Sequence, residues 1–454
     1  MAFQSINPTT EELIATYDEF TPAQIEAALD GANVAFLQWR ENSFEQRARL
    51  MRAAAATLRD DKSRLAVLIT SEMGKPVTEA EAEIEKCAWN CEYYAENTER
   101  FLAEEVIPTN ASHSYVRFDP LGVVLAIMPW NFPFWQVFRF AAPALMAGNT
   151  AVLKHASNVS GCALAIEDVF RKSAFPEGAF RTVLVPGSAV EGLIDDPRVR
   201  AVTLTGSDTA GVSVASAAGR ALKKTVLELG GSDPFIVLGD ADIEAAAQTA
   251  ARARNINSGQ SCIAAKRFIA IADVAGEFEE KFCAAIAAFK VGDPMNRATQ
   301  IGPLARADLR DTLQRQVEQS VEMGARVVMG GGVREGRGYF FEPTVITDLK
   351  PDMPVFREET FGPVAAVVRA RDTDQAIRMA NHSVYGLGAS LWTGDVDKGR
   401  ELAGQIEAGA VFINGMVASD PRLPFGGVKR SGYGRELSSF GIREFVNVKT
   451  VWVG

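Results

Sequence analysis

The N-terminal part of the chain carries the hydrophobic periodicity of amphipathic helices. From residue 22 to residue 105, apolar residues recur at spacings of three and four, and two of these runs begin directly after Thr21 and Ser43. This spacing places apolar side chains on one helix face, and Thr and Ser commonly cap helix N-termini. We therefore expect helices through most of this region.

From about residue 115 the pattern changes to short apolar runs, each ended by Pro, Gly or a small polar residue, that alternate with helical segments. A first series comprises "GVVLAIMP", "TAVLKHA", "FRTVLVPG", "AVTLTGS" and "KKTVLELGG". A second series runs from "PFIVL" near residue 230 to "GAVFING" near residue 420. Such alternation is typical of a parallel sheet covered by helices on both faces. The sequence predicts two α/β domains, and leaves "HSYVRFDP" and "REFVNVKTVWVG" as short β arms of the kind that often complete a neighbour's sheet.

Composition narrows the class of protein. The chain has 454 residues, is 47% hydrophobic and carries a net charge of −10 without a basic run, which argues against nucleic-acid binding. Residues 121–153 are long and apolar, but Pro129, Asn131, Pro133, Arg139 and Pro143 interrupt them, so they indicate strand, turn, helix and strand rather than a membrane span. The start lacks a signal-peptide pattern, so we expect a cytoplasmic protein.

The cysteines and histidines do not form a metal-ligand pattern. The five cysteines, at positions 87, 91, 162, 262 and 283, are scattered, which favours free thiols in a reducing compartment. Cys87 and Cys91 are four apart on a predicted helix and are interpreted as packing residues. The three histidines are far from one another, so no metal site is expected.

Cys262 stands in an unusual setting, "NSGQSC", a polar glycine-containing loop. A thiol with an ordinary pKa of about 8.5 needs a cation, a helix N-terminus or hydrogen-bond donors nearby to become a nucleophile. Flexible backbone N–H groups in such a loop suit both a thiolate and a developing oxyanion. The alternative is a loop cysteine without a function.

Glu228 ends the apolar strand "KKTVLE", next to Gly230 and Gly231. Active sites of parallel sheets gather at the carboxyl ends of the strands. A carboxyl group buried there has a raised pKa and can serve as a general base, whereas the alternative is a structural ion pair.

The segment "MPWNFPFWQVFRF" supplies an amide and a single charge. Asn131 is expected to cap an apolar helix and to direct its side-chain N–H₂ at an oxyanion. In a helix from Phe132, Asn131, Trp135 and Arg139 share one face. A buried Arg139 requires a partner, which is either a substrate carboxylate or an internal Asp or Glu. A fourth segment, "VTLTGSDTAG", places Gly206 and Gly211 at the start of a helix, where phosphates bind.

Taken together, these segments resemble the aldehyde dehydrogenase superfamily over essentially the whole chain, and most of all its succinate-semialdehyde dehydrogenase branch. The matching motifs are "PWNFP", "LELGGSDP", "NSGQSC", "EETFGPV" and "PFGGVKRSGYGRE", in the family's order. The resemblance implies two Rossmann-like three-layer α/β/α domains and a small β oligomerisation arm, assembled as a homodimer or homotetramer. It assigns residues 1–112 and 121–229 to a dinucleotide-binding domain, 230–425 to a catalytic domain, and 113–120 and 426–454 to the arm.

The resemblance also implies a mechanism. Cys262 attacks the aldehyde, Asn131 and the Cys262 backbone N–H hold the oxyanion, a hydride passes to the nicotinamide, and Glu228 activates water to hydrolyse the thioester. Because relatives that acylate CoA typically lack the glutamate, Glu228 favours release of a free acid. The rival classes are a hydrolase that uses the same cysteine without redox chemistry and a non-enzymatic descendant.

Cofactor residues follow from the same motifs. Lys154 contacts the adenosine ribose, Ser207 the pyrophosphate and Glu359 the nicotinamide ribose. Many NAD-preferring relatives have a glutamate at position 157, so Ser157 predicts that NADP is preferred and NAD is possible. The full set of expected cofactor-binding residues is Pro129, Trp130, Lys154, Ser157, Gly187, Thr205, Gly206, Ser207, Leu229, Glu359 and Phe361.

For the substrate, the resemblance implies that Arg139 and Ser419 bind a carboxylate of succinate semialdehyde, together with Trp135 and Ser261. Ile256 stands where some members carry a second arginine, which is a departure from the pattern. Another aliphatic or amino aldehyde, oxidised by the same machinery, therefore remains the alternative substrate.

Overall fold

The computed structural model describes residues 2–454, and its first large unit is a six-stranded sheet. The strand order is β19-β9-β8-β5-β6-β7, with β19 antiparallel to its neighbour and the other pairs parallel. The strands are β5 (Val123–Met128), β6 (Thr150–His155), β7 (Phe180–Thr182), β8 (Val199–Thr205), β9 (Lys224–Glu228) and β19 (Gly432–Tyr433).

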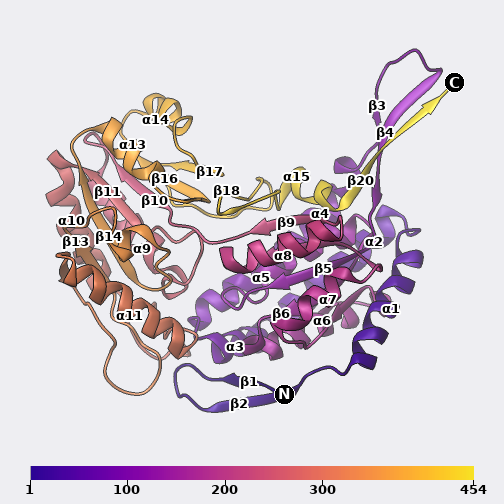
Figure 1. Cartoon of the computed structure of the whole chain (residues 1–454), viewed down its shortest axis with the longest axis horizontal. Coiled ribbons are helices and arrows are strands. Elements are labelled where there is room, and N and C mark those ends of the chain that lie inside the picture. Colours follow the sequence, from indigo (N-terminus) through magenta and orange to yellow (C-terminus); the bar gives the residue numbers. More distant parts are fainter. Residues whose placement is uncertain (1) are drawn as a thin grey trace.

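Helices cover both faces of this sheet (Figure 1). Alternate residues of β5 divide between two cores, because successive strand side chains point to opposite faces. Val124 and Ala126 pack in the core that contains residues of α2 (Phe44–Asp60), α3 (Lys62–Met73), α4 (Val77–Phe101), α5 (Trp135–Met146) and α6 (Ser160–Lys172). Val123 and Leu125 pack in the core that contains residues of α1 (Pro22–Trp39), α7 (Val190–Asp195) and α8 (Asp208–Arg220).

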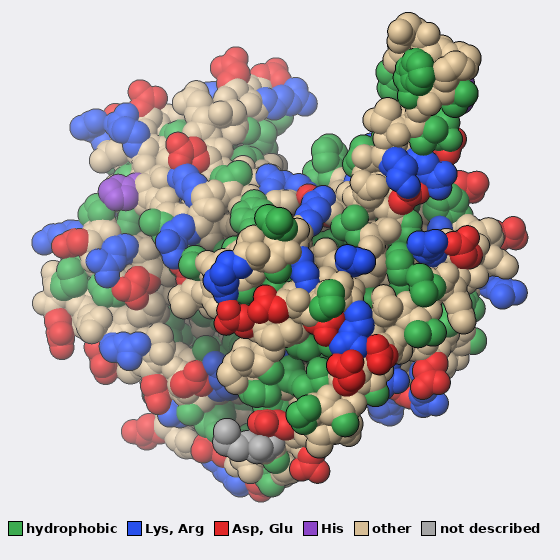
Figure 2. Space-filling model, turned by 45° about the vertical axis from the view of Figure 1, so that its right-hand side comes forward, with side chains coloured by type: hydrophobic (Ala, Val, Ile, Leu, Met, Phe, Trp, Pro, Cys, Tyr) green, Lys and Arg blue, Asp and Glu red, His purple; other side chains and the backbone are tan. Residues whose placement is uncertain are grey.

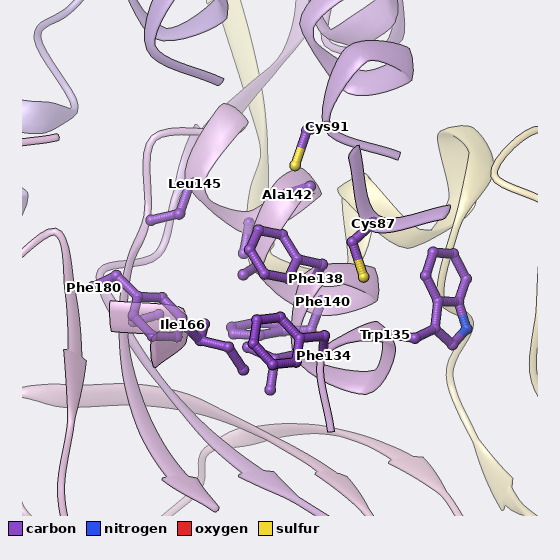
Figure 3. Packing of buried hydrophobic residues seen from close by; sticks show 14 of the residues in the cluster. Cys87, Cys91, Phe134, Trp135, Phe138, Phe140, Ala142, Leu145, Ile166 and Phe180 are labelled. Atoms are coloured by element: carbon purple, nitrogen blue, oxygen red, sulfur yellow. The ribbon is translucent and has the colours of Figure 1, made fainter. Parts of the chain in front are cut away.

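The predicted N-terminal helices are present with the predicted starts. Thr21 and Ser43 cap α1 and α2 through capping boxes, in which each side chain accepts a hydrogen bond from the backbone N–H three residues on. Cys87 and Cys91 lie on α4 and are fully buried against Phe134 and Phe138, so their interpretation as packing residues is confirmed (Figure 3).

The second large unit is a seven-stranded sheet of order β12-β13-β14-β11-β10-β16-β17, parallel except for β12. Phe235 and Val237 of β10 pack on one face, and Ile236 of β10 packs on the other face together with Leu238, which follows the strand. The strands are β10 (Pro234–Val237), β11 (Arg267–Ile271), β12 (Arg326–Met329), β13 (Thr344–Thr347), β14 (Val364–Ala370), β16 (Gly388–Trp392) and β17 (Ala410–Ile413). Its helices are α9 (Ile243–Asn255), α10 (Ala272–Ala287), α11 (Ala307–Glu322), α12 (Pro354–Arg357), α13 (Thr373–Asn381) and α14 (Val396–Ala403).

A three-stranded antiparallel arm projects from the body together with the C-terminus (Figures 1 and 2). It consists of β4 (His113–Pro120) between β3 (Glu105–Val106) and β20 (Val446–Val453). β4 has the predicted bounds. The structure does not place residues 426–445 in this arm, which corrects the expected range of 426–454.

Residues 426–445 instead pair with strands outside the arm, in a separate two-stranded sheet and at the edge of the six-stranded sheet. β18 (Val428–Lys429) pairs with β15 (Tyr385–Gly386), and β19 joins the edge of the six-stranded sheet before α15 (Ser438–Ile442). Close approach explains this path: Gly432 has a φ of +110°, and a Cβ there would lie 1.9 Å from the backbone oxygen of Leu227.

The remaining elements are short. An N-terminal hairpin of β1 (Ala2–Ile6) and β2 (Leu13–Asp18) was not predicted. Single turns of 3₁₀ helix occur at η1 (Ser157–Val159), η2 (Gly187–Ala189), η3 (Ile256–Gly259) and η4 (Arg443–Phe445). Over residues 2–454, none of the helices combines the length and the apolar character that a membrane crossing needs.

Candidate active site

The loop that carries Cys262 is built on three consecutive residues with left-handed backbone. Asn257, Ser258 and Gly259 have φ values of 52°, 55° and 77° in the η3 turn that follows α9. Only glycine fits at position 259, because a Cβ there would lie 2.3 Å from the backbone carbonyl carbon of Gly362. The turn therefore fixes the position of Cys262.

The polar residues before the cysteine are buried and hydrogen-bonded, which corrects the expectation of a flexible open loop. The Asn257 side-chain amide donates to the backbone oxygens of Asn131 (2.7 Å) and Gln260 (3.0 Å). The side chains of Ser258 and Gln260 each accept from a backbone N–H of the segment 302–305, at 2.9 Å. These residues satisfy buried backbone groups and hold the loop between two segments of the chain.

Lys266, which the sequence analysis did not single out, binds the same loop from the other side. Its buried ammonium donates to the backbone oxygens of Ser261 (3.1 Å), Cys262 (2.8 Å) and Ala264 (3.1 Å). Within residues 2–454, the backbone N–H of Cys262 has no protein acceptor. It is therefore available as a donor to a bound ligand.

The Cys262 thiol is neutral in the free protein. Burial raises its pKa to about 12, and the positive charges of Arg139 and Lys266 oppose that shift only in part. The expectation that this loop favours the thiolate is thus not met by the protein alone, and ionisation of the sulfur requires a proton acceptor or a further positive charge.

Asn131 precedes the helix rather than capping it. α5 begins at Trp135 and its N-cap residue is Phe134, which corrects the expected helix start. The Glu83 carboxylate, rather than Asn131, accepts from the backbone N–H groups of Phe134 and Trp135, each at 2.9 Å. The buried Asn131 amide donates to the backbone oxygen of Gln260 at 3.1 Å. One of its two N–H groups is used in this way, so the other is available beside the Cys262 loop.

Arg139 has an internal acidic partner, the second of the two alternatives predicted for it. Its guanidinium forms an ion pair with Glu436, and both side chains are almost completely buried, at 2% and 4% exposure. It also donates to the Thr205 hydroxyl at 3.3 Å and lies 4.7 Å over the Phe425 ring. Arg139 is thus held within the protein before any substrate arrives.

Glu228 lies at the end of β9 as predicted and is 2% exposed. Neither of its carboxyl oxygens has a hydrogen-bond partner among the described residues. Burial raises its pKa well above the usual value, Glu436 adds to this shift, and Arg139 opposes it. Burial therefore favours the protonated form of Glu228, and the described residues supply no hydrogen-bonded ion pair for it.

A cavity of about 500 Å³ opens beside Cys262. The four residues expected to bind substrate, Trp135, Arg139, Ser261 and Ser419, all line it together with the cysteine. Asn131 and Glu228 lie outside the cavity wall.

Lys86 of α4 also lines this cavity and was missed by the sequence analysis. Its ammonium donates to the Ser419 hydroxyl at 2.7 Å and lies 4.2 Å from the centre of the Trp135 ring. The sequence offered no signal for it, because a lysine within a long helix is usually a solvated charge.

The expected cofactor residues gather at the carboxyl ends of the strands of the six-stranded sheet, the usual ligand edge of such folds. Two more come from the loop before β14 and reach this edge: the Glu359 carboxylate accepts from the Gly231 backbone N–H at 2.9 Å, and the Phe361 ring meets Trp130 edge-to-face at 5.7 Å. The residues at the strand ends are Pro129, Trp130, Lys154, Ser157, Gly187, Thr205, Gly206, Ser207 and Leu229.

Lys154 and Ser157 fit an anionic ligand. Lys154 follows the centre of β6, and burial lowers its pKa without any compensating carboxylate. No hydrogen bond or ion pair engages its ammonium within residues 2–454. Ser157 is exposed at the start of η1, and Ser207 caps α8, where the helix N-terminus favours negative charge. An uncompensated cation and two hydroxyls at helix starts are the donor set that a phosphate requires.

The chain is similar over its whole length to several known proteins. The chain is 52% identical over 453 residues to a probable succinate-semialdehyde dehydrogenase [NADP(+)] of Synechocystis sp., with 100% of both chains covered. It is 52% identical over 456 residues, again with 100% of both covered, to succinate-semialdehyde dehydrogenase [NADP(+)] 1 of Mycobacterium tuberculosis. Among solved structures, the succinic semialdehyde dehydrogenase of Streptococcus pyogenes in complex with NADP+ is 37% identical and superposes with a TM-score of 0.98 over 100% of both chains.

The sequence model of one protein family matches almost the whole chain. The model for the aldehyde dehydrogenase family matches residues 1–451, a span that contains the Cys262 loop, the Glu228 strand end and the edge with Lys154. Together with the two Rossmann-like sheets and the full-length relatives, this match shows that the chain belongs to the aldehyde dehydrogenase family.

Proposed function

We propose that this chain oxidises succinate semialdehyde to succinate, with NADP+ as the preferred cofactor and NAD+ as a possible one. The observation that carries the proposal is the cavity beside Cys262, because Trp135, Arg139, Ser261 and Ser419 share its wall with the cysteine. The full-length relatives are succinate-semialdehyde dehydrogenases that use NADP+, which supports the same substrate and cofactor for this chain.

In the first half of the reaction, the Cys262 thiol gives its proton to water and the sulfur bonds to the aldehyde carbon, so that the C=O π bond breaks and the carbonyl oxygen becomes an oxyanion. The free N–H of the Cys262 backbone and the second N–H of the Asn131 amide are the donors available to it. Lys154, Ser157 and Ser207 would hold the phosphates of NADP+, and the bound cofactor would supply the hydride acceptor for the aldehyde carbon. Loss of that hydride leaves a thioester on Cys262.

In the second half, Glu228 acts as the base for hydrolysis. In its ionised form, the buried Glu228 carboxylate takes a proton from water as the water oxygen bonds to the thioester carbon. The carbon–sulfur bond then breaks, the carboxylic acid leaves, and the sulfur is regenerated. The oxygens of Glu228 are without protein partners, so they can accept a water proton.

The cofactor preference rests on the residue pair at the end of β6. Lys154 supplies positive charge and Ser157 a hydroxyl donor, and neither residue repels a 2′-phosphate. Glu359, fixed by the Gly231 N–H, would hold the nicotinamide ribose, with Phe361 beside it.

A panel of aldehydes with both cofactors, followed at the nicotinamide absorbance, tests this proposal. We expect kcat/KM to be highest for succinate semialdehyde with NADP+, and Cys262→Ala to abolish turnover while the fold persists. A higher value for butanal or for an amino aldehyde of similar length would favour the alternative substrates. Hydrolysis of a p-nitrophenyl ester without any nicotinamide-dependent activity would favour a hydrolase.

We also propose a role for each domain and an oligomeric state for the protein. Residues 1–112 and 121–229 would bind the dinucleotide and 230–425 would carry the catalytic cysteine, in a cytoplasmic homodimer or homotetramer. Exposed apolar residues on the arm, among them Val106, Val448 and Trp452, support a role in assembly. Trp452→Asp should then lower the mass measured by light scattering, and an unchanged mass would argue against the arm as the interface.

A further inference from the structure

Lys86 is a cation without a carboxylate partner at the wall of the substrate cavity. Within residues 2–454 no carboxylate lies at ion-pairing distance from its ammonium, which contacts only the Ser419 hydroxyl and the Trp135 ring. A half-buried charge of this kind is costly unless a ligand compensates it.

The other cations of the cavity are already engaged or lie in solvent. Arg139 is paired with Glu436, and Arg297 forms two hydrogen bonds of 2.8 Å with Glu81 while two-thirds exposed. Arg252 is exposed on α9. Because solvent screens exposed charges, Lys86 is the cation in the described cavity wall best placed to discriminate between charged and neutral ligands.

The surroundings of Lys86 favour an anionic ligand. Burial and the neighbouring positive charge of Arg139 from α5 together lower its pKa to about 8. Cys87 and Glu83 on its own helix and Asp420 from the loop after β17 act in the opposite direction but do not cancel the shift. A carboxylate bound in the cavity would stabilise the ammonium.

We propose that Lys86 is a specificity-determining residue that binds the carboxylate remote from the aldehyde group of the substrate, together with the Ser419 hydroxyl. Ser419 accepts a hydrogen bond from Lys86, so its own proton is free to be donated to the same carboxylate. The inference rests on the proposed function, since it concerns an aldehyde that carries a carboxylate. It differs from the expectation that Arg139 is the principal carboxylate ligand.

The test compares succinate semialdehyde with butanal, which lacks the carboxylate, in the full-length protein with NADP+. Lys86→Met keeps the length of the side chain but removes the charge. We expect KM for succinate semialdehyde to rise about 10- to 100-fold, the usual value of a hydrogen bond to a charged group, with a much smaller change in kcat. KM for butanal should stay the same or fall, and Lys86→Arg should restore most of the affinity for the semialdehyde.

The pH dependence provides a readout that a merely structural role would not move. The ammonium is present below its pKa and lost above it, so the ratio of kcat/KM for succinate semialdehyde to that for butanal should fall as the pH rises through about 8. Taking the ratio removes the common dependence on Cys262 and Glu228. In Lys86→Met the ratio should be flat between pH 7 and 9.

The outcomes separate the two proposals. Lys62→Met removes one positive charge from the neighbouring helix α3, at a 40% exposed side chain, and should leave both substrates unaffected. If the parent protein prefers butanal, the proposed function fails. If the parent prefers the semialdehyde and Lys86→Met keeps that preference, the role of Lys86 is refuted while the proposed function stands. Equal losses for both aldehydes would also refute it, because they would indicate a structural role.

Discussion

Replacing Arg139 by methionine should destabilise the protein and impair both charged and neutral aldehydes. Arg139 is 2% exposed and forms the ion pair with Glu436, which has no other side-chain hydrogen-bond partner among the described residues. Breaking a buried pair by removing one partner typically costs about 3–5 kcal/mol, because the remaining charge is left without compensation. The positive charge also opposes the upward pKa shifts of Glu228 and Cys262, so its loss makes both groups harder to ionise.

A double-mutant cycle with Glu436→Gln isolates the pair. The double variant leaves two uncharged side chains, so we expect it to be more stable than the sum of the single losses predicts, by at least about 2 kcal/mol. Stability is measured by urea unfolding and activity by kcat/KM for succinate semialdehyde and butanal. Arg100→Met, at an exposed position on α4, is the control and should change stability by less than about 1 kcal/mol.

The pH dependence of the loss has a definite sign. Burial raises the folded-state pKa of Glu436, and removing Arg139 raises it further. As the pH rises above the ordinary carboxyl pKa, the unfolded chain releases this proton while the folded variant retains it, so the stability of the variant falls. The destabilisation by Arg139→Met should therefore be smaller at pH 5.5 than at pH 8. A variant as stable as the parent that loses only succinate semialdehyde would refute this reasoning, since Arg139 would then be free to serve the substrate.

Three further predictions concern the cofactor edge and the Cys262 loop. Ser157→Glu should shift the ratio of kcat/KM values from NADP+ toward NAD+, because a carboxylate there repels a 2′-phosphate; an unchanged ratio would remove Ser157 from the cofactor site. Gly259→Ala should lower kcat at least tenfold, because the added Cβ would lie 2.3 Å from the backbone of Gly362, whereas Gly276→Ala, in open space on α10, serves as a neutral control. Alkylation of Cys262 by iodoacetamide in the free protein should accelerate about tenfold per pH unit from 7 to 9, since the thiol pKa is about 12, and a plateau near pH 8 would contradict a neutral resting thiol.

Hydrophobic periodicity was sufficient to predict the elements that build the cores. β5 is an apolar run of six residues that is buried on both faces, and β6 contains the buried apolar run 151–153, so both stand out from the sequence. The hairpin of β1 and β2 escaped because its side chains are mostly exposed and carry no apolar pattern. Element boundaries were less certain: the run "RFIAIADV" suggested one long strand, but β11 ends at Ile271 and α10 begins at the next residue.

The sequence predicted which residues form the site but not which of their side chains contact one another. The sequence pointed to Cys262, Glu228 and Asn131 because the chemistry of each side chain does not match its neighbours. Glu228 and Asn131 are polar within apolar segments, and Cys262 lies in a polar loop. The ion pair of Arg139 with Glu436 and the contact of Lys86 with Ser419, 333 residues away along the chain, depend on how distant segments meet. Local sequence patterns do not show which distant residues come into contact. The sequence therefore left two kinds of partner open for Arg139 and gave no signal for Lys86.

Burial gives the free protein an acid–base state that differs from the one catalysis uses. Burial raises the pKa values of both Cys262 and Glu228 above their ordinary values, so it favours the protonated form of the nucleophile and of the base. A protonated thiol is a poor target for oxidation and alkylation, because the thiolate is the reactive form. Arg139 acts on both groups, since its charge lowers the pKa of each. Ligands that bring positive charge to Cys262, or that exclude the remaining water around Arg139, would therefore strengthen the ionised form of the thiol, and reactivity would appear only when the site is filled.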